Sequence, residues 1–241
     1  METAPLPQFE SDRYRPVAAP LHTICVLAVL GVWAYWGSTR SDQMRAAANP
    51  DRVSFYTRIL LFEWFMFAVV VLGVRLNGSP LRTILGDRWR SVREVLRDIG
   101  IAGAFWIVFT TVLSVFGSHR SATSSRAVQF ILPQGGLETT LWIALSITAG
   151  ICEETLYRGY LQRQFTAMTK AVPLGVLLSA AAFGLGHSYQ GLAGAIRITL
   201  GGVLLGILAH WRGSVRPGMI AHAWGDFFAG VLARLMGIRV G

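Results

Sequence analysis

The chain has 241 residues, of which 53% are hydrophobic and 15% charged, with a mean hydropathy of +0.47 and a net charge of +9. These values exclude an ordinary soluble domain, in which about a quarter of the residues are charged. They also exclude a disulfide-rich scaffold, because the two cysteines, Cys25 and Cys152, lie in separate apolar stretches. We therefore expect an all-α fold, a polytopic transmembrane bundle of about seven to eight helices.

The positive charge lies mostly between the apolar blocks of the chain. In that position it is typical of topology signals in membrane proteins, and no basic run is interleaved with aromatic residues as a nucleic-acid surface would be. The distribution of Lys and Arg favours a cytoplasmic tail at residues 1–20. Because this tail is polar and no clear cleavage site follows, the first apolar block is predicted to be a span and not a signal peptide.

Seven apolar blocks are long enough to cross a bilayer, which takes about 20 residues, or fewer where aromatic side chains anchor the ends. The predicted spans are residues 21–37, 59–74, 99–117, 137–152, 172–187, 192–209 and 218–236. The first three and their connections form an N-terminal transmembrane region at 21–136. The last four form a membrane core at 137–236.

The connection after the second span is basic, with six arginines from Arg75 to Asp98. Apolar residues recur within it at helical spacing and predict an amphipathic helix at the membrane interface: Leu85, Trp89, Val92 and Leu96. A serine-containing stretch at 118–136 is predicted to be an external loop. Glu63, next to Trp64 in the second span, is interpreted as interfacial or paired.

Polar side chains at the apolar blocks of the core are candidates for function, because an ionised group in hydrocarbon costs about 2.5–3.5 kcal/mol. Glu153 and Glu154 follow the apolar run that ends at Cys152, and Arg158 lies where it can pair with Glu154 on a helix. Two adjacent carboxylates in a low-dielectric site differ in proton affinity. One of them can therefore act as a general base near neutral pH.

His187 ends the next predicted span. If the helix that carries Glu154 reverses near Lys170, Glu154 and His187 lie at matching depth in the bundle. Gly184 and Gly186 allow a neighbouring helix to approach closely. We therefore expect the imidazole to come within reach of the carboxylates.

His222 and Asp226 lie four residues apart in the last predicted span, so both project from one helix face. They can donate hydrogen bonds to a developing oxyanion or complete a metal shell with Glu and His, and their spacing leaves both alternatives open. Together with the carboxylates and His187, they are sufficient to activate a water molecule and to stabilise a tetrahedral intermediate.

Three ordered motifs of the core resemble one family of membrane peptidases, the CAAX protease and bacteriocin-processing family (CPBP, type II CAAX prenyl endopeptidase-like, or Abi). The motifs EExxxR, FxxxH and HxxxN or HxxxD are matched by Glu153 to Arg158, Phe183 to His187, and His222 to Asp226. The resemblance covers about residues 137–236, and the N-terminal spans are variable in that family. It implies a membrane protease.

The resemblance also implies roles for these residues. Glu153 would be the general base that activates water, with help from His187. Glu154 and Arg158 would position the helix that carries Glu153. His222 and Asp226 would stabilise the oxyanion. Asp226 stands where the family often has Asn. Because an ionised Asp cannot donate a hydrogen bond, it must be protonated, orient His222 or touch a metal.

The family has been described both as zinc-dependent and as using glutamate without metal. In a metalloprotease of this kind the Zn²⁺ ligands would be Glu153, His187 and His222. The sequence leaves both mechanisms open.

The leading hypothesis is an intramembrane endopeptidase that hydrolyses a peptide bond of a membrane-associated or lipidated peptide. A non-proteolytic membrane scaffold or regulator is the alternative, and a haem or quinone site at His187 and His222 is a third. The expected partners are a peptide or protein substrate and the lipid bilayer, with no nucleic acid, and the oligomeric state is left open. The expected location is a cell membrane, crossed several times, with a bacterial inner membrane favoured.

Overall fold

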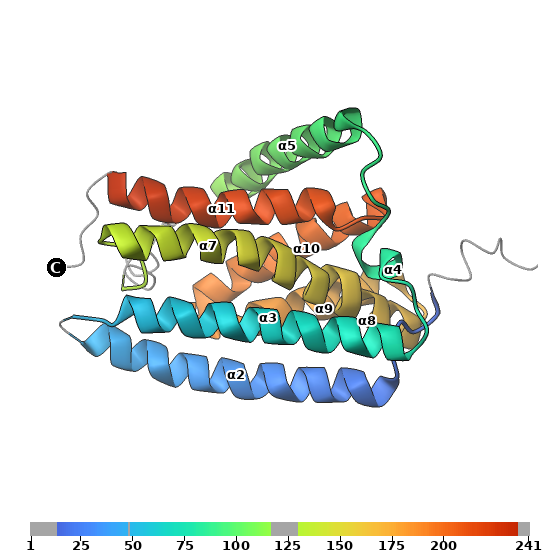
Figure 1. The fold of residues 1–241 in the computed structure, drawn as a ribbon, viewed down its shortest axis with the longest axis horizontal. Helices are drawn as coiled ribbons and strands as arrows, with labels where there is room; N and C mark the ends of the chain where they lie inside the picture. The colour runs from blue at the N-terminus through green and yellow to red at the C-terminus, as the bar shows by residue number, and fades with distance from the viewer. Residues whose placement is uncertain (1–13, 48, 117–129, 236–241) are drawn as a thin grey trace, which may run out of the picture.

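The computed structural model describes residues 14–47, 49–116 and 130–235 (Figure 1). Within these residues it has helices and no strand, which confirms the predicted all-α bundle. The elements are α2 (Pro20–Ala46), α3 (Arg52–Leu76), α4 (Arg82–Leu85), α5 (Val92–Phe116), α7 (Gly136–Glu153), the π-helix η2 (Glu154–Leu161), α8 (Gln162–Thr169), α9 (Val172–Gly186), the 3₁₀-helix η3 (Ser188–Gln190), α10 (Gly191–Arg212) and α11 (Arg216–Leu235). The tail up to residue 13, residue 117 at the end of the predicted third span, positions 118–129 of the predicted external loop and residue 236 lie outside the described residues.

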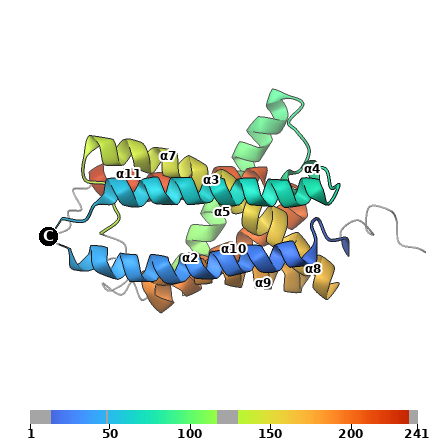
Figure 2. The ribbon, with the colours of Figure 1, turned by 60° about the horizontal axis from the view of Figure 1, so that its bottom comes forward.

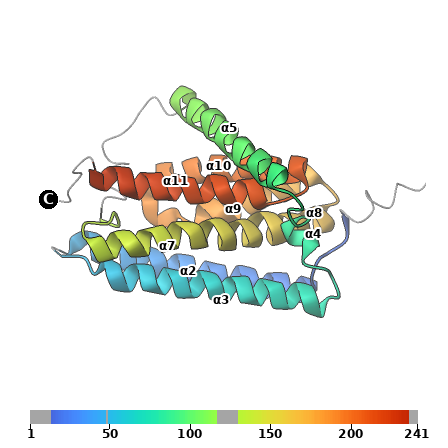
Figure 3. The same cartoon turned by 45° about the horizontal axis from the view of Figure 1, so that its top comes forward.

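The long helices other than α5 run along one common direction (Figures 1 and 2), and α7 lies between α3 and α11 (Figure 1). On the other side of the bundle, α9 packs between α8 and α10. Helix α5 crosses α11 at an angle and packs mainly against it (Figure 3). The central place of α7 matters for the site, because this helix can bring its side chains together with those of both neighbours.

Among the described residues, four helical segments are long and apolar enough to cross a membrane: Pro20–Ala46, Arg52–Leu76, Val92–Val112 and Ser188–Arg212. Helix α9 is apolar but shorter, and α7 and α11, which both carry charged residues, are not among these segments. Large apolar side chains on the outside of the bundle are exposed, among them Leu61 at 68% and Ile107 at 69%. In a bundle of this composition such a surface is the one that faces lipid.

The amphipathic helix predicted between the second and third spans is not present. Helix α3 continues to its end at Leu76, and residues 86–90, between α4 and α5, have no regular secondary structure. Gly86 ends α4 with a φ of +82°, a conformation that side chains with a β-carbon rarely adopt. Val92 and Leu96 therefore belong to the first turns of α5, where they are exposed.

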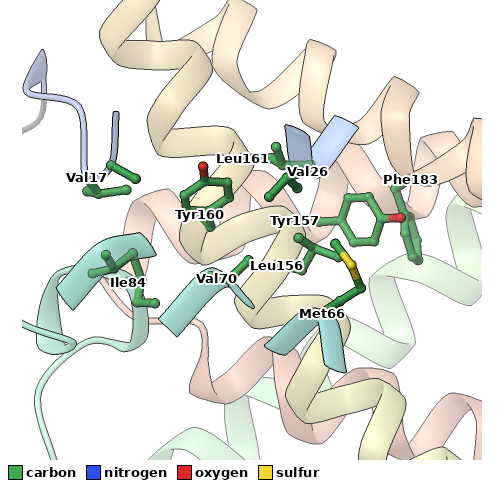
Figure 4. Close-up of a cluster of buried hydrophobic side chains, with 12 residues drawn as sticks. Val17, Val26, Met66, Val70, Ile84, Leu156, Tyr157, Tyr160, Leu161 and Phe183 are labelled. Carbon is green, nitrogen blue, oxygen red and sulfur yellow. The ribbon is translucent and has the colours of Figure 1, made fainter. Parts of the chain in front are cut away.

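The centre of the bundle is a cluster of buried apolar side chains around η2 (Figure 4). It joins five elements through Val26, Met66, Val70, Ile84, Leu156, Tyr157, Tyr160, Leu161 and Phe183. A buried amide fixes the same region to the start of α2, because Gln164 accepts a hydrogen bond from Val17 N at 2.7 Å and donates one to the Ala18 carbonyl at 3.0 Å. Close packing and interhelical hydrogen bonds of this kind hold membrane helices together.

Candidate functional site

The two adjacent glutamates lie where α7 passes into η2. The helix continues without a break through α8 to Thr169, and Lys170 ends it in the left-handed conformation, with a φ of 55°. The reversal predicted near Lys170 is confirmed. The π-helical hydrogen bonding of η2 was not predicted, and all eight of its residues are buried. Such widened turns occur frequently at functional sites.

Glu154 is fully buried and bonds to two side chains, the guanidinium of Arg158 and the imidazole of His222. Its Oε1 atom accepts a hydrogen bond from Arg158 Nη1 at 2.8 Å and another from His222 Nδ1 at 2.9 Å. The guanidinium of Arg158 also lies over the ring of Phe183, at 4.3 Å from its centroid. Glu154 therefore ties the last helix to η2 and fixes one nitrogen of the His222 ring.

A cavity of about 450 Å³ lies beside this pair, between α3, α7, α11 and the end of α9. Most of its lining is apolar, with several aromatic side chains. Four of the six predicted site residues line it: Glu153, His187, His222 and Asp226. Glu154 and Arg158 are not part of the lining, so they act on the cavity only through their neighbours.

Two carboxyl groups face the second nitrogen of His222. The Nε2 atom lies 3.6 Å from Glu153 Oε2 and 3.6 Å from Asp226 Oδ2, slightly longer than a hydrogen bond. Glu153 Oε2 is buried and has no hydrogen-bond partner. An unpartnered carboxylate oxygen at the wall of a cavity is free to accept a proton from a molecule bound there.

His187 lies at the end of α9 and reaches the cavity from the other side. Its Nδ1 atom donates a hydrogen bond to the Phe183 carbonyl at 2.9 Å. In the neutral ring this leaves Nε2 as an acceptor. The imidazole thus lines the same cavity as Glu153, although the structure gives no hydrogen bond between these two side chains.

Helix α11 is held close to its neighbours on both sides of His222. Trp106 of α5 donates to the Ala221 carbonyl at 2.8 Å, and Trp142 of α7 donates to the Asp226 carbonyl at 2.7 Å. Gly150 of α7 lets the two helices approach closely, since a β-carbon there would lie 2.6 Å from the Met219 carbonyl oxygen. These contacts set the depth and rotation of α11, and with them the place of its imidazole.

Comparison with known families agrees with this geometry. Residues 135–228 match the family described as type II CAAX prenyl endopeptidase Rce1-like. This part of the chain is an Rce1-like domain. The match confirms the family resemblance and covers all six predicted site residues. Neither the curated proteins nor the solved structures give a match to the chain.

The Rce1-like domain belongs to a family of proteases, and the chain around it has several apolar helices of membrane-spanning length. The protein is therefore a multi-pass membrane protein with a protease-family domain.

One carboxyl group at the site comes from outside the Rce1-like domain and was not predicted. Glu63 of α3 is only 7% exposed and lines the same cavity as Glu153. Glu63 was predicted to be interfacial or paired, and the interfacial alternative is wrong, because the side chain is buried and it is the adjacent Trp64 that faces outwards, at 46% exposure. The sequence held an indication of this burial, because Glu63 lies seven residues after Tyr56 and seven before Val70. Residues seven apart lie on the same face of a helix, and all three are buried.

The described side chains hold no preformed zinc site, since no three His, Cys, Asp or Glu residues among them are arranged to hold a metal ion. The Nδ1 atom of His222 is bonded to Glu154, and that of His187 donates to a backbone carbonyl. A metal ion would therefore have to use Nε2 of each ring. Zinc stays a prediction, and no step of the mechanism below passes through it.

The close approach of α7 and α11 can be tested at Gly150. A β-carbon at this position would also lie 2.9 Å from Ala223 Cβ, so Gly150→Val should push α11 away and separate His222 from Glu154. Because a displacement of about 1 Å at a catalytic group can cost about 10²-fold in rate, we expect peptidase activity to fall by about 10-fold to 10²-fold.

Gly103→Val is the matched control, since a β-carbon there meets nothing within 4 Å. Activity and unfolding temperature should be measured for both variants in detergent. Wild-type activity in Gly150→Val would contradict the view that helix spacing sets the site.

Proposed function

We propose that the protein is an intramembrane endopeptidase that hydrolyses a peptide bond of a membrane-associated or lipidated peptide. The observation that carries the proposal is the buried, unpartnered Oε2 of Glu153 on a cavity shared with His187, His222 and Asp226 in an Rce1-like domain. The apolar, aromatic lining suits a substrate with a lipid group or an apolar segment. The family description makes a prenylated CAAX peptide the first substrate to try.

In the proposed reaction Glu153 is the general base. A water molecule in the cavity gives a proton to Glu153 Oε2 as its oxygen attacks the carbonyl carbon, and the carbonyl electron pair moves to oxygen. His187 Nε2 accepts a hydrogen bond from the same water and orients it. The tetrahedral intermediate then breaks its C–N bond, and Glu153 returns the proton to the nitrogen of the leaving amine.

His222 is the proposed oxyanion stabiliser. Its Nδ1 hydrogen is held by Glu154 at 2.9 Å, which points Nε2 towards Glu153 and the cavity. When protonated, Nε2 donates a hydrogen bond to the oxyanion as negative charge develops there. A donor that is already in place stabilises the transition state without having to reorganise.

The proposal is tested by comparing peptide termini in the membranes of cells that make the wild-type protein or the Glu153→Ala variant. We expect a set of new termini that depends on Glu153. Glu94→Ala is the control, because Glu94 does not line the cavity. If the two sets of termini are identical while both proteins are inserted and folded, the peptidase assignment is wrong and a scaffold role is favoured.

A second prediction concerns Asp226, which stands where the family often has Asn. Its Oδ2 atom lies 3.6 Å from His222 Nε2, and the side chain is 44% exposed at the cavity. Asp226→Asn should keep kcat within about 10-fold of wild type, because an amide can both accept from the imidazole and donate to an oxyanion. Asp226→Leu should lower kcat by about 10²-fold to 10³-fold. An Asn variant as slow as the Leu variant would show that the negative charge is required.

A further inference from the structure

The basic connection between α3 and α5 lies away from the cavity, yet part of it is built into the fold. Helix α4, the start of α5 and the turn from α10 to α11 meet at one end of the bundle (Figures 1 and 3). Ser214 of that turn donates a hydrogen bond to the Leu85 carbonyl of α4 at 3.1 Å. Five residues form a charged group there that lies outside the cavity lining, the arginine cluster: Trp89, Arg97, Asp98, Arg212 and Arg216.

Asp98 is the acidic centre of the arginine cluster. Its side chain is buried, and its Oδ2 atom accepts a hydrogen bond from Trp89 Nε1 at 2.8 Å. Its Oδ1 atom accepts from Arg97 Nε and from Arg212 Nη2, both at 3.3 Å. The carboxylate therefore holds two guanidinium groups and an indole together, and it joins α5 to the turn between α10 and α11.

Arg216 belongs to the cluster through Trp89, because its guanidinium carbon lies 4.8 Å from the centroid of the indole ring. Among the described residues, no Asp or Glu forms an ion pair with Arg216. Its Nε atom, like that of Arg212, is buried without a hydrogen-bond partner. A guanidinium has five N–H donors, so both arginines of the turn are held in place with donors left over.

The cluster carries more positive than negative charge. Its three guanidinium groups stand against the carboxylate of Asp98, which leaves a surplus of two positive charges. The adjoining segment 87–94 has three arginines and two acidic residues and raises the surplus by one. The forked N–H pairs of arginine match the oxygens of a phosphate group, so phosphate is the anion that suits this cluster.

The cluster lies at the boundary of the apolar part of the bundle. The candidate membrane span of α5 begins at Val92, and that of α10 ends at Arg212. Trp89 is 40% exposed, as is typical of a tryptophan at the membrane interface. The N-terminal tail, predicted to be cytoplasmic, reaches the same end of the bundle, where Lys170 donates to the Tyr14 carbonyl at 2.9 Å (Figure 1). On that topology the cluster faces the leaflet that carries anionic lipids.

An exposed apolar stripe runs along α5 from the same end. Val92, Leu96 and Ile99 lie at helical spacing on one face of α5, and all three are exposed. Arg93 and Arg97 form the neighbouring row on this helix. Basic side chains next to an apolar face suit a phospholipid, whose phosphate is charged and whose acyl chains are apolar.

We propose that the arginine cluster is a binding site for an anionic phospholipid. Arg97, Arg212 and Arg216 bind the phosphate, and the acyl chains lie along the exposed stripe of α5. Asp98 and Trp89 hold the three arginines in place for this contact. The bound lipid bridges α5 and the turn that begins α11. Because the site shares no residue with the cavity, its test needs no peptide substrate.

The experiment measures lipid binding to the full-length protein in a non-ionic detergent by native mass spectrometry. The probes are short-chain phosphatidylglycerol, short-chain phosphatidylcholine and inorganic phosphate. We expect one phosphatidylglycerol to bind saturably, and about 5-fold or more tightly than phosphatidylcholine, whose choline cancels the phosphate charge. Inorganic phosphate should bind more weakly than either lipid, because it has no acyl chains for the stripe.

Arg216→Gln removes one phosphate ligand without leaving a carboxylate unpaired. We expect its affinity for phosphatidylglycerol to fall by about 5-fold to 10²-fold, the loss for one charged contact with a phosphate. Arg216→Lys keeps the charge without the forked donors and should lose less. Arg75→Gln is the matched control, since Arg75 is an exposed arginine near the end of α3, and its affinity should stay within about 2-fold of wild type.

Thermal unfolding of the same samples separates binding from a purely structural role. If Arg216 only packs on Trp89, Arg216→Gln lowers the unfolding temperature but binds phosphatidylglycerol as wild type does. The proposal predicts instead that phosphatidylglycerol raises the unfolding temperature of wild type and Arg75→Gln, and raises that of Arg216→Gln less. Arg97→Gln, at a half-exposed side chain, replaces Arg216→Gln if the latter fails to fold, and its affinity should fall in the same way.

Three results would overturn the proposal. The first is equal affinity of the wild type for phosphatidylglycerol and phosphatidylcholine. The second is wild-type affinity for phosphatidylglycerol in a folded Arg216→Gln or Arg97→Gln variant. The third is inorganic phosphate that binds as tightly as the lipid, which would assign the cluster to a soluble phosphate compound and not to the membrane.

Discussion

Glu153→Gln is expected to lower kcat by about 10²-fold to 10⁴-fold, the usual contribution of a general base, while KM and the unfolding temperature stay near their wild-type values. Glutamine has the size and shape of glutamate, but its amide cannot take a proton from water. Glu153 Oε2 has no hydrogen-bond partner, and His222, whose Nε2 lies 3.6 Å away, keeps its bond to Glu154 through Nδ1. The loss should therefore appear in the chemical step and not in folding.

The measurement uses purified protein and a peptide whose cleavage depends on Glu153, with thermal unfolding recorded on the same samples. Metal content should be determined as well. If Glu153 were a zinc ligand, the Gln variant would lose bound metal together with activity, whereas a general base would leave metal content unchanged. A Gln variant that cleaves at the wild-type rate would rule out Glu153 as the base.

Much of the site follows from the order and spacing of a few residues. The pair Glu154 and Arg158 was predicted from a spacing of four residues, and the structure bonds the two at 2.8 Å. The matching depth of Glu154 and His187 followed from a helix reversal at Lys170, which is present. These predictions rest on local geometry, because helical rise and turn position alone decide them.

Other features depend on contacts between distant parts of the chain, which spacing does not reveal. Nothing in the sequence distinguishes the ordinary α-helical turn from the π-helical turn that begins at Glu154. The bond from His222 to Glu154 joins helices 68 residues apart, and it depends on the close packing that Gly150 allows. The interfacial alternative for Glu63 failed for the same reason, since its neighbour Trp64 is a typical interfacial residue and the packing of α3 on α7 buries Glu63.

The failed prediction of an amphipathic helix has a local cause. The apolar spacing from Leu85 to Leu96 is helical, but Gly86 interrupts it with a left-handed backbone conformation. The chain turns there and starts α5 at Val92. The spacing of apolar residues does not reveal that a single glycine ends the helix.

The largest effect on stability is expected at the ion pair behind the cavity. The side chains of Glu154 and Arg158 are 0% and 1% exposed. Glu154→Leu should lower the free energy of unfolding by about 3–5 kcal/mol, because it leaves the guanidinium of Arg158 buried without its carboxylate. Asp42→Ala is the control, since the side chains of Asp42 and Arg45 are 73% and 40% exposed and pairs of this kind contribute about 1 kcal/mol or less.

The double variant Glu154→Leu with Arg158→Met separates stability from catalysis. Removing both charges leaves no unpaired ion, so most of the lost stability should return, as is common when a buried ion pair is replaced by apolar residues of similar volume. Activity should not return, because His222 Nδ1 loses the carboxylate that holds it at 2.9 Å. Denaturation in detergent and the peptide cleavage assay check the two parts. A double variant that is stable and fully active would mean that Glu154 serves only to neutralise Arg158 and does not orient the imidazole.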